Sequence, residues 1–158
     1  MSGDNSHAPE AGYDEAVAAA TPRLLRRVRE AGHDRTPEEV MSAATGDIVD
    51  PDATFDEELV TCSLDEILLA LVTLRTEGTH GTGLIDDIDG LFGVEPSPGT
   101  VYPRLHDLDA EGPLARHDLV RTKQYVVDDD SAARERLESA MHQHLAVGLF
   151  LAAALDTV

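Results

Sequence analysis

The apolar positions of residues 63–112 follow a helical period three times in succession. Residues 63–76 carry a wide apolar face, which is typical of a core helix, and Ser63-Leu64-Asp65-Glu66 predicts a capping box at its start. A shorter helix is predicted from about Thr82 to Phe92, and Gly93 is expected to end it. These segments predict a helical core.

The third helix is predicted from Ser97-Pro98-Gly99-Thr100 to about Gly112. Val101, Leu105 and Leu108 fall at i, i+4 and i+7, so we expect them to face the core. Its outward and neighbouring faces would then carry Thr100, Tyr102, Pro103, His106 and Asp107. Pro103 lacks an N–H donor, which predicts a stiff N-terminal end.

Two short extended segments follow, residues 114–120 and 123–127, with Arg121-Thr122 at the turn between them. This pattern predicts a small β-hairpin. Three helices followed by a hairpin is the order of a winged helix-turn-helix, so the predicted fold class is mainly α with a small β-hairpin (α+β).

The last helix is predicted to begin after a cap at 128–131 and to reach about Leu155. Its apolar residues recur at spacings of four and three, as in a coiled-coil seam, and other faces of the helix are apolar as well. Such a helix is expected to be buried against a second copy of the chain. The predicted homodimer interface comprises Met141, Leu145, Gly148, Leu149, Ala152 and Leu155.

Residues 1–12 are expected to form a disordered polar tail, and residues 13–31 a helix that Pro22 kinks. Thr36-Pro37-Glu38-Glu39 predicts a capping box for a short helix that stops near Gly46, and the acidic residues 47–60 are interpreted as a loop or linker. The predicted domains are the tail (1–12), a helical extension with its acidic linker (13–60), a DNA-binding domain (61–128) and a dimerisation helix (129–158).

The chain has 31 acidic and 12 basic residues and a formal net charge of −19, and Lys123 is the single lysine. This composition is typical of a protein adapted to a very salty cytoplasm, because a strongly acidic surface stays soluble there. The charge is uneven: residues 36–95 sum to −14, whereas residues 96–127 sum to 0. The neutral segment holds Arg104, Arg116, Arg121 and Lys123, and a second arginine group lies within residues 23–29. A polyanion would be tolerated at such segments and repelled elsewhere, unless the arginines only pair with nearby acids.

Several classes of protein are not indicated by the sequence. The chain shows no nucleophile–base arrangement, phosphate-binding glycine loop or metal-ligand spacing, so we expect no enzyme, no catalytic residue, no metal and no cofactor. The apolar run 145–155 is too short to span a bilayer, and residues 1–12 do not resemble a signal peptide, so we expect a cytoplasmic protein without membrane contact. Cys62, the single cysteine, is expected to be an inert buried thiol.

The sequence also resembles the PadR family of winged-helix transcriptional regulators, in the form found in halophilic archaea. The motifs that carry the resemblance are Leu68-Leu69-Ala70-Leu71, His80-Gly81, Phe92-Gly93, the run from Ser97 to Leu105, Leu108 with Glu111-Gly112, and Arg121-Thr122-Lys123-Gln124-Tyr125. The run from Ser97 to Tyr125 is similar, within that family, to activators of gas-vesicle genes. Thr82, Pro113 and the acidic residues 128–130 depart from the family pattern.

The resemblance implies binding of duplex DNA by a dimer that reads two half-sites about one helical turn apart. It places Thr100, Tyr102, Pro103 and Arg104 in the recognition-helix motif, and Arg121, Lys123 and Tyr125 in the wing motif. The predicted DNA contacts are therefore Ser97, Thr100, Tyr102, Pro103, Arg104, His106, Arg116, Arg121 and Lys123.

The predicted function is a sequence-specific DNA-binding transcriptional regulator, with gas-vesicle genes as candidate targets. The alternative is a winged-helix protein-interaction module that docks transcription machinery or a regulatory protein, with the N-terminal extension as the docking segment. The sequence does not distinguish an activator from a repressor, and it reveals neither the operator nor the inducing signal.

Overall fold

A computed structural model describes residues 26, 35–46, 49, 54–155 and 157. The predicted tail and the predicted helix over residues 13–31 lie outside the described residues. The elements run in the order α2 (Pro37–Thr45), α3 (Glu57–Cys62), α4 (Leu64–Leu74), β1 (Thr79–His80), α5 (Gly81–Phe92), α6 (Pro98–Glu111), β2 (Leu114–Asp118), β3 (Lys123–Val127) and α7 (Asp130–Leu155). The predicted fold class, mainly helical with a small sheet, is confirmed.

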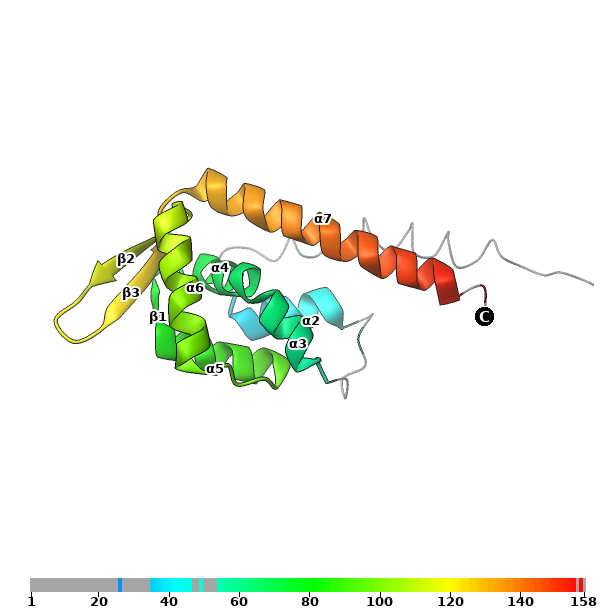
Figure 1. Cartoon of the computed structure of the whole chain (residues 1–158), viewed down its shortest axis with the longest axis horizontal. Coiled ribbons are helices and arrows are strands. Elements are labelled where there is room, and N and C mark those ends of the chain that lie inside the picture. Colours follow the sequence, from blue (N-terminus) through cyan, green and yellow to red (C-terminus); the bar gives the residue numbers. More distant parts are fainter. Residues whose placement is uncertain (1–25, 27–34, 47–48, 50–53, 156, 158) are drawn as a thin grey trace, which may run out of the picture.

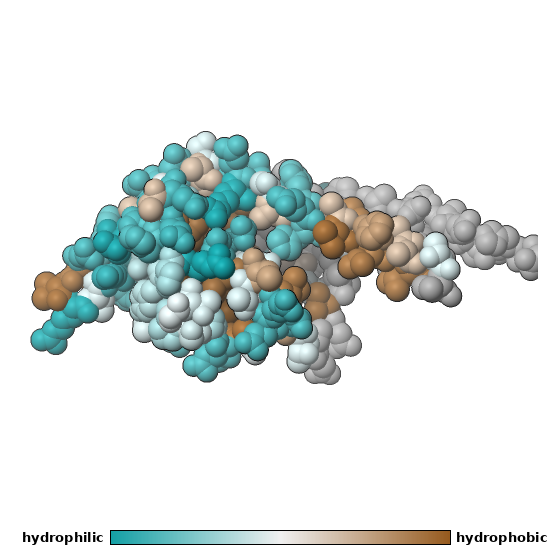
Figure 2. Space-filling view, in the orientation of Figure 1, coloured by the Kyte–Doolittle hydropathy of each residue, from teal (hydrophilic) through white to brown (hydrophobic). Residues whose placement is uncertain are grey.

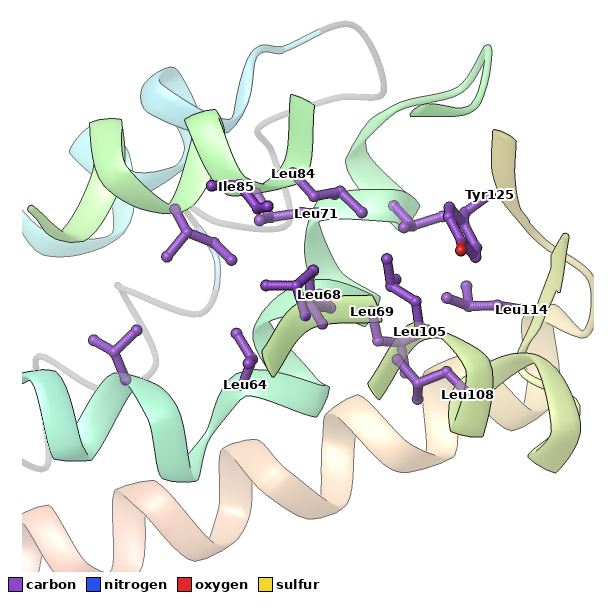
Figure 3. Packing of buried hydrophobic residues seen from close by; sticks show 14 of the residues in the cluster. Leu64, Leu68, Leu69, Leu71, Leu84, Ile85, Leu105, Leu108, Leu114 and Tyr125 are labelled. Carbon is purple, nitrogen blue, oxygen red and sulfur yellow. The ribbon is translucent and has the colours of Figure 1, made fainter. Parts of the chain in front are cut away.

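The core lies where α4, α5 and α6 meet the hairpin. Leu68, Leu84 and Leu105, one from each helix, are fully buried. Leu105 and Leu108 of α6 gather with Leu114 of β2 at one side of this cluster, as Figure 3 shows. The prediction that the i, i+4, i+7 stripe of α6 faces inward is confirmed, and this stripe fixes which face of α6 is left to solvent.

The sheet has three antiparallel strands in the order β1-β3-β2. Strands β2 and β3 form the predicted hairpin, with Asp118 opposite Lys123 next to the turn. Strand β2 is shorter than the predicted segment 114–120, because the hairpin tip begins at Leu119. Strand β1 was not predicted: Thr79 and His80 pair with Tyr125 and Gln124 and so tie the base of the hairpin to the start of α5.

Glycines end two of the helices in the left-handed conformation that favours them. Gly93 closes α5 with φ 66°, and Gly112 closes α6 with φ 103°. A side chain at either position would strain the backbone, so the two predicted helix ends follow directly from residue type. The predicted capping box of α2 is also present, because Thr36 and Glu39 each accept the other's backbone N–H.

Two expectations upstream of the core are wrong. Residues 57–60, the end of the predicted loop, belong to helix α3, which Asp56 caps by accepting the N–H of Leu59 at 3.0 Å, and Val60 is buried. Ser63 does not form a capping box: α3 runs almost directly into α4, and the Ser63 hydroxyl instead lies 3.0 Å from Nε2 of His144.

Cys62 is exposed, which corrects the expected buried thiol. It is the last residue of α3, and it lines a shallow groove between that helix and α7. A sequence pattern that treats this segment as a linker cannot place the thiol, because its exposure depends on the path of α3 beneath α7.

The last helix spans 26 residues, which corresponds to about 39 Å. Its N-terminal part packs against α4 through Ala133 and Leu137, and its cap is Asp129, which accepts the N–H groups of Ser131 and Ala132. Its C-terminal turns extend past the other labelled helices and strands (Figure 1).

Candidate nucleic-acid interface

The N-terminal half of α6 presents a mixed polar and aromatic surface to solvent. Tyr102, Pro103 and His106 are exposed, and Thr100 is half-buried. The Ser97 and Thr100 hydroxyls lie 2.9 Å apart, so these two side chains hold one another at the start of the helix. Pro103 lies in the second turn, and α6 stays helical through it. This surface has the width and the side-chain chemistry that a major-groove helix needs.

Tyr102 is held by close packing on the start of α5. A Cβ atom at Gly81 would lie only 2.6 Å from Cε1 and 2.8 Å from the hydroxyl oxygen of Tyr102, a contact that real Cβ atoms do not make. The bare backbone of Gly81 therefore forms the bed on which the aromatic ring lies. The position of Tyr102 depends on α5 as well as on its own helix.

We expect Gly81→Ala to displace the Tyr102 ring while the domain remains folded. The added methyl group overlaps a partly exposed side chain that has solvent to move into, and no positive φ is described at Gly81. The stability loss is therefore expected to be about 1 kcal/mol, with a clear change in Tyr102 fluorescence or its NMR ring shifts. Gly83→Ala is the matched control, because a Cβ there meets only the Thr79 hydroxyl, at 3.3 Å. Unchanged Tyr102 signals in Gly81→Ala would contradict the packing.

Two of the predicted DNA-contacting arginines are engaged within the protein. Arg104 Nη1 lies 3.3 Å from both carboxylate oxygens of Asp65 on α4. Nε of Arg116 lies 3.6 Å from the Asp118 carboxylate, and its side chain is only 30% exposed. The charge pattern left open whether the arginines only pair with nearby acids. For Arg104 and Arg116, the structure shows that they do. Neither presents an unpaired cation to a ligand.

Arg116 shares a face of the sheet with Tyr125, its partner in the ladder. Tyr125 is buried, and burial raises the pKa of its phenol, while the nearby Arg116 guanidinium acts in the opposite direction. The phenol thus stays neutral, and Tyr125 supports the wing from the core side. Although the resemblance places Tyr125 in the wing motif, its burial makes it a packing residue.

Arg121 and Lys123 lie at the far end of the wing, and within the described part of the chain neither forms an ion pair. With Tyr102 they line a groove of about 540 Å³ between α6, the start of α5 and the hairpin tip. The structure thus brings together three of the nine predicted contacts, and Asp118, already paired with Arg116, is the acidic residue of this lining.

The groove also contains residues that the sequence did not single out as contacts, namely His80, Thr82, Leu119 and Val120. The histidine and the threonine flank Gly81, and β1 brings them beside the hairpin. His80 Nδ1 lies 3.2 Å from the carbonyl oxygen of Lys123. The motif His80-Gly81 was the available signal, but without the β1–β3 pairing it gave no reason to place these residues at the site.

Among the described residues, no group of three or more His, Cys, Asp or Glu side chains is arranged to hold a metal ion. No described helix combines the length and apolarity that crossing a bilayer requires. The chemistry of the groove is that of a cationic and aromatic surface beside an exposed helix, which suits a polyanion.

Three helices, a tethering strand and a hairpin define a winged-helix protein. Residues 68–131 match the Transcriptional regulator PadR-like family, so this part of the chain is similar to PadR-like domains, as the sequence motifs predicted. The family is one of transcriptional regulators.

Similar proteins are transcriptional activators of haloarchaea. Transcriptional activator GvpE1 of Halobacterium salinarum is 41% identical over 102 residues, which are 65% of this chain and 53% of that protein. Transcriptional activator GvpE of Haloferax mediterranei is 40% identical over 102 residues, with the same shares. This chain therefore spans about half the length of the curated relatives it matches. The predicted similarity to haloarchaeal activators is confirmed.

Proposed function

We propose that the chain is a sequence-specific double-stranded DNA-binding regulator of transcription that acts as a homodimer in the cytoplasm of a salt-adapted cell. The observation that carries this proposal is the groove in which exposed Tyr102 of α6 lies beside Arg121 and Lys123 of the wing, two cations that form no ion pair with the described residues. A helix in the major groove with an adjacent cationic hairpin on the backbone is how winged helices engage a duplex.

Within the proposed interface, the residues of α6 would read base edges and the wing would contact phosphates. Thr100, Tyr102, Pro103 and His106 lie on the solvent side of α6, beside Ser97 at its start. Arg104 and Arg116 would act indirectly, because each is held by an aspartate of the protein. In this proposal, the bases are read by the exposed face of α6, which carries few formal charges.

Salt limits what phosphate contacts contribute in such a cell. Binding that depends on counterion release weakens steeply as the salt concentration rises. With a net charge of −19, the chain also repels DNA everywhere except near its cationic segments. We therefore expect base contacts and shape fit to supply most of the affinity, and we expect the salt dependence to be shallower than that of a basic regulator.

The proposed dimer forms through the C-terminal half of α7. Figure 2 shows this part of the surface as an apolar patch that extends past the polar body. Leu145, Leu149 and Leu155 of the predicted seam are exposed, and Phe150 on another face of the helix is 72% exposed. The other predicted seam residues are Met141 and Ala152, which are half-buried, and Gly148. Leaving such a patch in water is unfavourable, and a second α7 would cover it.

We expect Leu145→Asp combined with Leu149→Asp to convert the dimer to a monomer, because two carboxylates would have to be buried in the seam. Sedimentation velocity in concentrated KCl measures the change, and we expect dimerisation to be weakened by at least about a hundredfold. Ala154→Asp is the control, because it lies two and a half turns from Leu145 and so on the opposite face. A monomer for the control and a dimer for the double variant would place the seam on the other side of α7.

The similar haloarchaeal proteins are named transcriptional activators, and we propose the same sense of regulation here. Gas-vesicle genes are the proposed targets. The residues before α2 would then contact the transcription machinery or a regulatory protein.

The test is genome-wide recovery of DNA by the tagged full chain in its native salt, followed by selection from random duplexes in about 2 M KCl. We expect a few promoters to be enriched and to share a two-fold symmetric site, with gas-vesicle promoters among them. Recovery of proteins without any enriched duplex would overturn the proposal in favour of a protein-interaction module.

A further inference from the structure

The tip of the wing carries two adjacent aliphatic side chains among polar residues. Leu119 is 50% exposed and Val120 is fully exposed, at 101%. They begin the tip Leu119-Val120-Arg121-Thr122, in which the Leu119 N–H donates to the Thr122 carbonyl at 2.8 Å. Figure 2 shows the end of the hairpin as an apolar patch beside strongly hydrophilic atoms.

The geometry of the turn does not require these two residues. Gly, Asn, Asp, Pro and Ser dominate hairpin tips because they supply unusual backbone angles or local hydrogen bonds. The tip contains none of them, and the positive φ values described in the chain all lie elsewhere. Exposed aliphatic side chains also promote association, and some salts strengthen that tendency. Leu119 and Val120 are therefore better explained by contact with a partner than by folding.

We propose that Leu119 and Val120 insert into the minor groove of the duplex, beside the half-site that α6 reads. This inference rests on the proposed DNA-binding function and adds an apolar contact to it. Both residues line the same groove as Tyr102, so they are continuous with the proposed interface. Arg121 follows them directly, which brings a cation toward the phosphates that border a minor groove.

Minor-groove proteins use aliphatic side chains in this way, as wedges against or between base pairs. Such a contact has a particular advantage for an acidic protein in concentrated salt. The contribution of apolar burial does not depend on the release of counterions, so it persists where phosphate contacts have become weak. As the salt concentration rises, the phosphate contacts of Arg121 and Lys123 contribute less to DNA affinity, and the apolar contact of the wing tip would make up part of that loss.

The test uses the full chain, the duplex recovered by selection, and fluorescence anisotropy from about 0.5 to about 3 M KCl. The variant is Leu119→Ser with Val120→Ser, and its control is the swap Leu119→Val with Val120→Leu, which keeps the tip apolar. We expect the serine variant to bind at least about tenfold more weakly at every salt concentration, because the buried apolar area is lost. Its slope of log Kd against log [KCl] should match that of the unchanged protein, because no phosphate contact is removed. The swap should bind nearly normally.

Base substitution tests whether the wing tip enters the minor or the major groove of the duplex. Guanine places an amino group in the minor groove that inosine lacks, whereas the two bases have the same major-groove edge. At the step beneath the wing, we expect G·C to weaken the unchanged protein relative to I·C, and the serine variant to bind both duplexes equally.

Four results would overturn the inference, and three of them leave the proposed function intact. In the first, the serine variant binds like the unchanged protein while Arg121→Glu with Lys123→Glu loses binding, so the tip contacts something other than DNA, such as a protein. In the second, the serine variant weakens binding with a reduced salt slope, so its effect is on phosphate contacts. In the third, the serine variant distinguishes G·C from I·C as strongly as the unchanged protein does. Failure of the unchanged protein to bind any duplex would instead remove the proposed function, and this inference with it.

Discussion

Arg121→Glu combined with Lys123→Glu is expected to weaken binding to the selected duplex by about a hundredfold or more, with no loss of folding. Each cation would make a charge-assisted contact worth about 1.5–3 kcal/mol, and a tenfold change in affinity corresponds to about 1.4 kcal/mol. The reversed charges add repulsion from the phosphates. Because both side chains are exposed and without ion pairs in the described structure, their loss leaves no buried charge unpaired.

Fluorescence anisotropy at several KCl concentrations measures this effect, and a thermal melt in the same salt tests the fold. The salt slope should also fall by about two, one for each lost phosphate contact. Arg35→Glu with Arg134→Glu is the matched control, since both side chains are exposed and the net charge changes equally. Equal losses in the two variants would mean that overall charge, rather than the wing, governs binding.

The second large effect concerns stability. We expect Leu105→Ala to lower the free energy of unfolding by about 2–5 kcal/mol, a large part of the roughly 5–15 kcal/mol of a typical domain. Leu105 is fully buried where α6 meets the core, and the cluster around it contains side chains from α4, α5 and the sheet (Figure 3). Truncation there leaves a cavity that the surrounding helices fill only in part.

Urea unfolding at fixed KCl concentration measures the loss. Leu119→Ala is the control, because it removes the same atoms from a half-exposed side chain at the wing tip, and we expect it to cost less than about 0.5 kcal/mol. Similar losses for the two variants would show that α6 is not anchored through its i, i+4, i+7 stripe. The exposed face of α6 would then not be held in place by the packing of its buried face.

The helices of the winged domain were predictable because each has a local signal. Residues such as Val101, Leu105 and Leu108 repeat with the helical period, and Gly93 and Gly112 mark helix ends by residue type alone. The hairpin was predictable for the same reason, since its two strands are neighbours in the sequence.

Strand β1 and helix α3 had no such signal. Two residues, Thr79 and His80, are too short a segment to show a period, and their hydrogen-bond partners lie more than forty residues away. Helix α3 is six residues long within an acidic segment, where Val60 alone is buried. Both elements exist because tertiary contacts stabilise them, which a single sequence does not display.

The surroundings of the candidate residues were predictable only in part. Arg104 and Arg116 were grouped with Arg121 and Lys123 because all four interrupt the acidity of the chain. Charge counted along the sequence does not show that Asp65, thirty-nine residues before Arg104, approaches it in space. Leu119 and Val120 were treated as strand residues, so their exposure at the tip was also not predicted.

Asp65 lies between two arginines from different helices. It accepts hydrogen bonds from Arg104 of α6 and from Arg136 of α7, each at 3.3 Å, and Arg136 also pairs with Glu66 and Glu111. In the proposed dimer, α7 fixes the partner's position and α6 enters the DNA major groove. Because Asp65 joins these two helices through Arg104 and Arg136, the distance between the two α6 helices of the dimer would be fixed. Each base pair inserted between half-sites turns one of them by about 35° around the duplex axis. A dimer with rigidly held α6 helices would therefore select operators by the spacing of their half-sites as well as by their bases.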